Sequence, residues 1–166
     1  YEGTVNEFRG DGLMALFGAP IAHEDHAQRA CYAALNIQKA LVVYQEKLKQ
    51  AYGLDFKMRI GLNSGTLVVG TIGDDLRMDY TAMGDTANLA ERIETLAAPG
   101  SVLLSSNTFR IAQDYFECLA KEKTLVKGKE EPQESYELVR AKEIETRLEA
   151  SAARGLTELV GRHPER

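Results

Sequence analysis

The chain has 166 residues, of which 44% are apolar and 27% charged, and its formal net charge at pH 7 is −5. These values are those of one soluble globular domain with a tail, large enough to bury a core. The acidic balance without any Lys/Arg block argues against nucleic acid as a partner, and no apolar run approaches the roughly 20 residues of a membrane-spanning helix.

The chain begins with a predicted β-hairpin. Apolar-rich runs at residues 4–9 and 13–17 flank the sequence Gly10-Asp11-Gly12, which is typical of a tight turn between two strands.

A long helix is predicted over residues 24–50, where apolar side chains recur at helical spacing and acidic residues occupy the first turn. Gly53 is expected to end it. The two cysteines, Cys31 and Cys118, have no metal-ligand spacing, and Cys31 falls on the apolar face of this helix. A small buried hydrophobe in a reducing compartment is therefore the favoured interpretation, which together with the lack of a secretory signal predicts a cytoplasmic protein.

Three strands are predicted next. Residues 56–62 alternate apolar with polar or small side chains, which indicates a strand with one buried face. A turn at Asn63-Ser64-Gly65 leads to a strand at 66–71, and a polar loop leads to another at 80–83.

The following helix carries the most informative pair of side chains. Asp85 is placed to cap it, and Pro99-Gly100 follows its end. Asn88 and Arg92 are spaced i, i+4 and so share one face, while apolar residues occupy the opposite arc. An amide and a guanidinium presented together suit a ligand with hydrogen-bonding edges and negative oxygens.

The remaining elements complete an α+β alternation. Residues 102–104 are predicted as a strand, 106–113 as a short helix, and two further strands surround Lys127-Gly128. Helices packed on one sheet are expected from this order.

Five ordered segments of the sequence resemble the class III nucleotidyl cyclase catalytic domain. They include the hairpin of residues 7–18, Ala19-Pro20 with the following His23-Glu24-Asp25-His26, residues 59–65, the stretch 78–94, and residues 126–128. The resemblance covers roughly residues 1–139 and implies a ferredoxin-like fold, with a mixed or antiparallel sheet and helices packed on it. It implies conversion of ATP to cyclic AMP and pyrophosphate, with two Mg²⁺ or Mn²⁺ ions per site.

The resemblance also implies roles for individual residues. Asp11 would bind metal, Asn88 would orient the ribose, and Arg92 would stabilise charge on the α-phosphate in the transition state. Lys129, or its neighbour Lys127, would reach the terminal phosphates. The family's first metal-binding Asp lies on a strand before the hairpin, and the sequence printed here starts after that position; the 166 residues alone are therefore expected to be inactive.

The purine pocket departs from the family's pattern. By family position the base is read by Glu7 and Thr81, where adenylyl cyclases most often carry Lys with Asp or Thr. A carboxylate can accept the N1 and N2 hydrogens of guanine, whereas adenine N1 is itself an acceptor. The local chemistry thus favours guanine, whereas the family favours adenine. Alternatively, Glu7 is an exposed carboxylate on a strand and has no role in ligand binding.

Three functions follow from these observations: an adenylyl cyclase, a guanylyl cyclase, or a non-catalytic homologue that serves as a dimerisation or nucleotide-sensing module. The resemblance also implies a homodimer whose shared sites take Asp11 and the Asn88/Arg92 pair from different subunits. His23 and His26, spaced i, i+3, fit a polar helix start better than a metal site.

The sequence after residue 139 predicts a linker and the start of a further module. Residues 140–155 are rich in Ala, Glu and Arg and are predicted as a helical linker, and residues 156–166 resemble the start of an ATPase module that would follow the catalytic domain.

Overall fold

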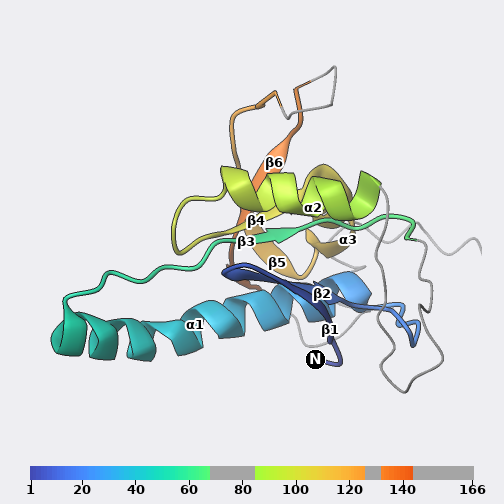
Figure 1. Cartoon of the computed structure of the whole chain (residues 1–166). Helices are drawn as coiled ribbons and strands as arrows, with labels where there is room; N and C mark the ends of the chain where they lie inside the picture. The colour runs from blue at the N-terminus through green and yellow to red at the C-terminus, as the bar shows by residue number, and fades with distance from the viewer. Residues whose placement is uncertain (68–84, 126–131, 144–166) are drawn as a thin grey trace, which may run out of the picture.

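The computed structural model describes residues 1–67, 85–125 and 132–143. Within these ranges the chain forms a two-stranded hairpin and a four-stranded sheet that has helices on both faces (Figure 1). None of the helices in these ranges is both long and apolar enough to cross a membrane.

The predicted hairpin is confirmed. Strands β1 (Thr4–Arg9) and β2 (Gly12–Leu16) pair antiparallel, with Arg9 opposite Gly12. Gly10 and Asp11 therefore form a two-residue turn, and Gly10 has a φ of +60°, a left-handed conformation that glycine adopts without steric cost.

The four-stranded sheet has the order β3-β4-β6-β5. Strand β3 (Ile60–Leu62) runs parallel to β4 (Val102–Ser105), whereas β6 (Ser135–Ala141) is antiparallel to both β4 and β5 (Phe116–Ala120). All residues of β4 are buried, as expected for a strand covered on both faces.

Two apolar clusters join the helices to the sheet, and β4 contributes to both. On one face, helices α1 (His26–Tyr52) and α3 (Ser106–Ala112) pack with Val102, Leu104 and Phe116. On the other face, helix α2 (Asp85–Leu96) packs through Ile93 on Leu103. The change of face between Leu103 and its neighbours follows from the two-residue period of a strand. The α+β architecture is thus confirmed.

Two local expectations were wrong. Helix α1 begins at His26, so the acidic residues precede its first turn, and Asp25 accepts a hydrogen bond from Arg29 instead of capping the helix. The strand expected over residues 56–62 is limited to Ile60–Leu62, because only these residues pair with β4.

Other boundaries lie close to those expected. Helix α1 ends at Gly53, whose φ is +68° and whose N–H donates to the carbonyls of Leu48 and Lys49. Strand β6 continues to Ala141, so residues 140 and 141 belong to the sheet and not to a linker. Thr66 and Leu67 are not in a strand; the rest of that predicted strand, the strand at 80–83, and the segments 126–131 and 144–166 lie outside the described residues.

Candidate active site

Helix α2 presents Asn88 and Arg92 on the side away from its packed face. Asn88 is exposed and Arg92 half-buried, whereas Ala87 is buried and Ile93 is buried against Leu103 of the sheet. Asp85 is the first residue of the helix, where its charge complements the helix N-terminus. The amide and the guanidinium therefore lie on the side of α2 that a ligand can approach.

A glycine sets the distance between α2 and the sheet. A Cβ on Gly61 would lie 2.5 Å from the carbonyl oxygen of Ala90 and 2.7 Å from Cα of Glu94, and would collide with the Glu94 nitrogen. These are backbone atoms that cannot turn aside, so only glycine lets α2 lie directly on β3. A glycine inside a strand is a known signal of close backbone approach, and Gly61 carries this signal although no site role was predicted for it.

The other proposed site element is the hairpin. Asp11 is exposed at its turn, and Glu7 lies in β1 with its backbone opposite Met14. Two further predicted site residues, Thr81 and Lys129, lie outside the described residues, as does Lys127. The structure therefore brings Asn88 and Arg92 together but does not test the base-reading pair or the phosphate lysine.

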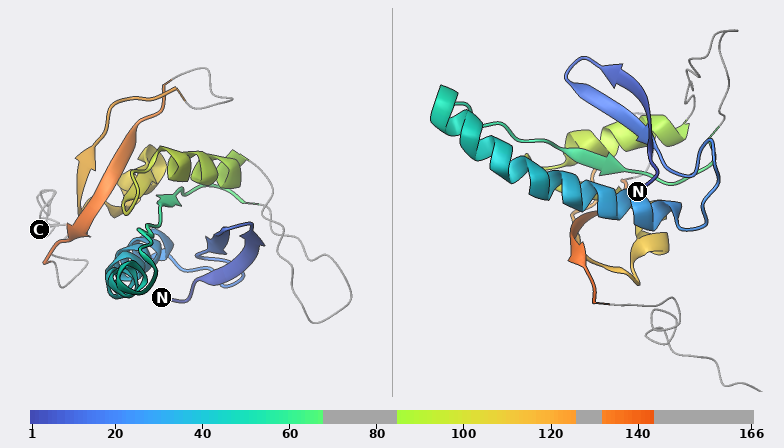
Figure 2. Two further views of the ribbon diagram at one scale, coloured as in Figure 1. Left: turned by 60° about the vertical axis from the view of Figure 1, so that its left-hand side comes forward. Right: turned by 90° about the horizontal axis from the view of Figure 1, so that it is seen from below.

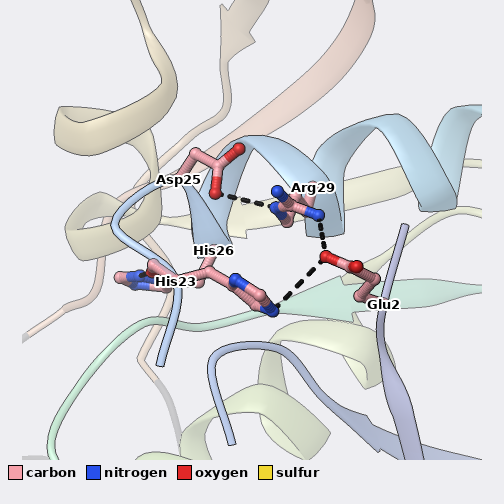
Figure 3. Close-up of polar contacts among 5 residues, drawn as sticks. All are labelled: Glu2, His23, Asp25, His26 and Arg29. Carbon is pink, nitrogen blue, oxygen red and sulfur yellow. Dashed lines mark hydrogen bonds and ion pairs between the residues drawn. The ribbon is translucent and has the colours of Figure 1, made fainter. Parts of the chain in front are cut away.

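A polar cluster joins the N-terminal segment to the start of α1 (Figure 3). Glu2 accepts a hydrogen bond from Arg29 and lies 3.4 Å from Nε2 of His23, and Arg29 also donates to Asp25 at 2.7 Å. Nδ1 of His26 lies 3.0 Å from the carbonyl oxygen of His23. The described residues hold no group of three or more His, Cys, Asp or Glu side chains placed for a metal ion. The two histidines thus take part in polar contacts at the start of α1.

Aromatic contacts extend this cluster into a strap, which we define as residues 1–3. Tyr1 stacks on Tyr32 with ring centroids 6.3 Å apart, and its hydroxyl accepts a hydrogen bond from Asn36. Arg29, Tyr32 and Asn36 are spaced i, i+3, i+7, so the strap follows one face of α1. The backbone of Gly3 lies against the Phe17 ring, because a Cβ there would be 2.6 Å from a ring carbon. The strap therefore fixes how the chain enters the hairpin.

The hairpin turn and the start of α2 lie at different ends of the molecule. In Figure 1 and in the right panel of Figure 2, the turn between β1 and β2 points towards the end where α2 finishes, and α2 begins at the opposite end. Asn88 follows the first residue of α2 by three positions. Within one chain the hairpin turn, which carries Asp11, is thus separated from the first turn of α2.

The cysteines are not placed for catalysis. Cys31 is fully buried, and burial raises the pKa of its thiol to about 12; burial also raises the pKa of Cys118. Both thiols are therefore protonated at neutral pH, and the expectation that Cys31 is a small buried hydrophobe is confirmed.

Comparisons with known proteins agree on one family. The family described as "Adenylate and Guanylate cyclase catalytic domain" matches residues 6–140. Adenylate cyclase 1 of Rhizobium meliloti is 35% identical over 142 residues, which is 84% of this chain and 21% of that protein. The chain thus spans about a fifth of the length of this relative.

Solved structures show the same likeness. The adenylyl cyclase CyaB from P. aeruginosa has a TM-score of 0.77 and 31% identity, covering 85% of this chain and 74% of that one. The guanylate cyclase domain of RhGC from Catenaria anguillulae, solved in complex with GTP, has a TM-score of 0.72 and 31% identity, covering 84% and 74%.

Proposed function

We propose a function that proceeds from the family: this chain belongs to the adenylate and guanylate cyclase catalytic domain family. The proposal is that the chain is the catalytic domain of an enzyme that converts ATP to cyclic AMP and pyrophosphate. The observation that carries the proposal is the pair Asn88 and Arg92, presented together on one face of a helix that is packed directly on the sheet. The resemblance to adenylate cyclases supports ATP as the substrate.

The reaction needs no protein nucleophile. The ribose 3′-oxygen forms a bond to the α-phosphorus, the bond from that phosphorus to the bridging oxygen breaks, pyrophosphate leaves, and the hydroxyl proton passes to solvent. The protein must hold the nucleotide in line and stabilise negative charge as it moves between the phosphates. Asn88 is proposed to orient the ribose, and the Arg92 guanidinium to bind the α-phosphate oxygens.

Membership of this family implies dependence on a divalent cation. Asp11 fits such an ion as a single ligand, because its carboxylate is exposed at a tight turn. No described group of acidic residues completes a site around it, so further ligands would come from elsewhere. A bound Mg²⁺ or Mn²⁺ would lower the pKa of the 3′-hydroxyl and neutralise phosphate charge; two ions per site are proposed.

The active form is proposed to be a homodimer with shared sites. One face of the hairpin carries Val5, Phe8 and Leu13, whose exposed fractions are 52%, 76% and 54%. Phe8 lies opposite Leu13, and Val5 lies opposite Ala15, so these side chains form one apolar surface. A second copy would cover this surface and could bring its own α2 to the hairpin turn.

Mixing inactive variants tests site sharing. Asp11→Ala and Arg92→Ala should each abolish most activity, because each removes one component from both sites. In a mixed dimer one of the two sites is wild type. An equal mixture of the two variants should therefore regain, averaged over all dimers, roughly half of the activity of one site per dimer. Heterodimers that form without regaining activity would refute shared sites.

Guanylyl cyclase activity is the second candidate, and Glu7 is the observation that favours it. An assay of the longest natural chain that carries this sequence, with Mn²⁺ and with ATP and GTP supplied separately, distinguishes the two. If Glu7 and Thr81 read the base, Glu7→Lys should raise the ATP/GTP preference by about tenfold, since an ammonium can donate to adenine N1. An unchanged ATP/GTP preference in an active Glu7→Lys variant would exclude Glu7 from the purine pocket. A natural protein that is inactive with both nucleotides would favour the non-catalytic homologue.

We also propose a phosphate-binding residue, a following module and a location for the protein. Lys129 would contact the terminal phosphates, and an ATPase module would follow the catalytic domain. The free thiols Cys31 and Cys118 support a cytoplasmic location.

A further inference from the structure

We propose that Asn63 is a positioning residue that anchors the first turn of α2 and thereby holds Asn88 in its working orientation. The inference rests on the proposed function for the role of Asn88. The anchor itself rests on hydrogen bonds within the described residues.

Both ends of the Asn63 amide are engaged. Asn63 directly follows β3, and its Nδ2 donates to the carbonyl oxygen of Thr86 at 2.9 Å, while its Oδ1 accepts from the Ser105 hydroxyl at 2.7 Å. Thr86 is the second residue of α2 and Ser105 is the last residue of β4. One side chain thus joins the ends of two neighbouring strands to the start of the helix.

The strand end of this link is fixed by buried groups. Ser105 is 3% exposed, and its oxygen also accepts from the Thr108 amide at 3.3 Å as the N-cap of α3. Thr108 is 1% exposed, and its hydroxyl donates to the Leu62 carbonyl and lies 3.0 Å from the Ser64 hydroxyl. Such a satisfied buried network is rigid, because breaking any bond leaves a polar group unpaired.

The loop after Asn63 holds the helix from a second direction. The Thr86 hydroxyl donates to the carbonyl of Thr66 at 2.6 Å, and a Cβ on Gly65 would lie 2.8 Å from that hydroxyl oxygen. Thr86 precedes Asn88 by two residues, so its backbone position sets where the Asn88 amide points. Arg92 lies one turn further along, beside Ile93 and the Gly61 contact, and should depend less on Asn63.

The first test measures steady-state kinetics on the longest natural protein that contains this sequence. Asn63→Asp replaces the donor to Thr86 with a carboxylate oxygen, so kcat should fall by about tenfold while KM stays within about threefold. Ile93→Val is the matched control: it loosens the packing of the same helix without touching the anchor, and it should lower thermal stability while kcat is retained. An unchanged kcat in a folded Asn63→Asp variant would overturn the proposal.

A double-mutant cycle separates positioning from plain stability, and it uses the milder Asn63→Ala in case the carboxylate prevents folding. If Asn63 acts through Asn88, the double variant Asn63→Ala/Asn88→Ala should be no slower than Asn88→Ala alone. Fully additive losses would mean that Asn63 acts elsewhere.

Amide hydrogen exchange provides a readout that needs no activity. In Asn63→Ala, exchange should accelerate at residues 88–91 and stay unchanged at residues 116–120 of β5, because the side-chain hydrogen bonds of Asn63 go to α2 and to the end of β4. Unchanged exchange at residues 88–91 would overturn the anchor whether or not the wild type makes a cyclic nucleotide. If the wild-type chain has no cyclase activity but Asn63→Ala changes the exchange as expected, the proposed function is contradicted and the anchor is still supported.

Discussion

Helix α2 and the β1–β2 hairpin, the two elements proposed to serve the nucleotide, are held in the fold by different means. Helix α2 lies on the sheet at a distance set by backbone contact at Gly61, with Ile93 fully buried beneath it. The hairpin is tied to α1 through the strap, whose Glu2 pairs with Arg29 of α1; the two side chains are 64% and 30% exposed. Buried packing tolerates little movement, whereas exposed ion pairs contribute roughly 0–1 kcal/mol each and weaken in salt.

This difference indicates that the two elements serve the proposed site in different ways. The groups proposed to act on the α-phosphate and ribose are pre-organised, as transition-state stabilisation requires. The element proposed to carry the metal ligand is tied to α1 by exposed contacts, and its apolar face is exposed. Four predictions test this contrast, beginning with the largest expected effect.

Gly61→Ala should remove the close approach of α2 to β3. The added methyl group overlaps backbone atoms of α2, so the free energy of unfolding should fall by about 3 kcal/mol or more, or the protein should fail to fold. Thermal unfolding measures the loss. Gly53→Ala is the control, because Gly53 has a positive φ, unlike Gly61, and no atom lies within 4 Å of its added Cβ; it should cost about 1 kcal/mol. Equal losses in the two variants would contradict the special role of Gly61.

Asn88→Ala and Arg92→Ala should lower kcat by about 10² or more with little change in nucleotide affinity. Their proposed contacts strengthen only as charge moves on the phosphates, so the loss appears in turnover. Steady-state kinetics together with binding of a non-cyclisable analogue measure both quantities. Weaker binding at unchanged turnover would place the two side chains in ground-state recognition instead.

Arg29→Gln should loosen the hairpin without unfolding the core. The concentration of divalent cation needed for half-maximal activity should rise by about two- to threefold, and the difference should shrink at high salt because exposed pairs are screened. The matched control is Arg140→Gln, which breaks the exposed pair with Glu117 (2.7 and 2.9 Å) on the sheet. A similar rise in both variants would show that the strap has no specific effect on the metal site.

The smallest expected effect concerns pH. The hydrogen bond from Arg29 lowers the pKa of Asp25 below its ordinary value of 3.8. A carboxylate with a lowered pKa stabilises the folded state above that ordinary value, and the contribution disappears as the pH falls through the lower folded-state pKa. Asp25→Asn should therefore be slightly less stable than the wild type at pH 6 and equal to it in strong acid. A carboxylate titration of Asp25 at or above 3.8 would contradict this prediction.

Local sequence signals were sufficient to predict most elements. The hairpin follows from Gly10-Asp11 between two apolar runs, and the end of α1 follows from Gly53, because both depend on backbone conformations that glycine favours. The face shared by Asn88 and Arg92 follows from helical periodicity alone. These properties are determined within a few residues of chain.

Contacts between distant segments were decided only by the tertiary structure. The alternating pattern at 56–62 predicts a longer strand than β3, because a strand exists only where a neighbouring strand pairs with it. The strap joins residues 1–3 to positions 29–36 and to Phe17, and the Asn63 anchor joins β3, β4 and α2; no local pattern indicates either. The sequence thus determined which side chains α2 presents, and the packed fold determined how firmly they are held, because buried contacts form only when remote parts of the chain meet.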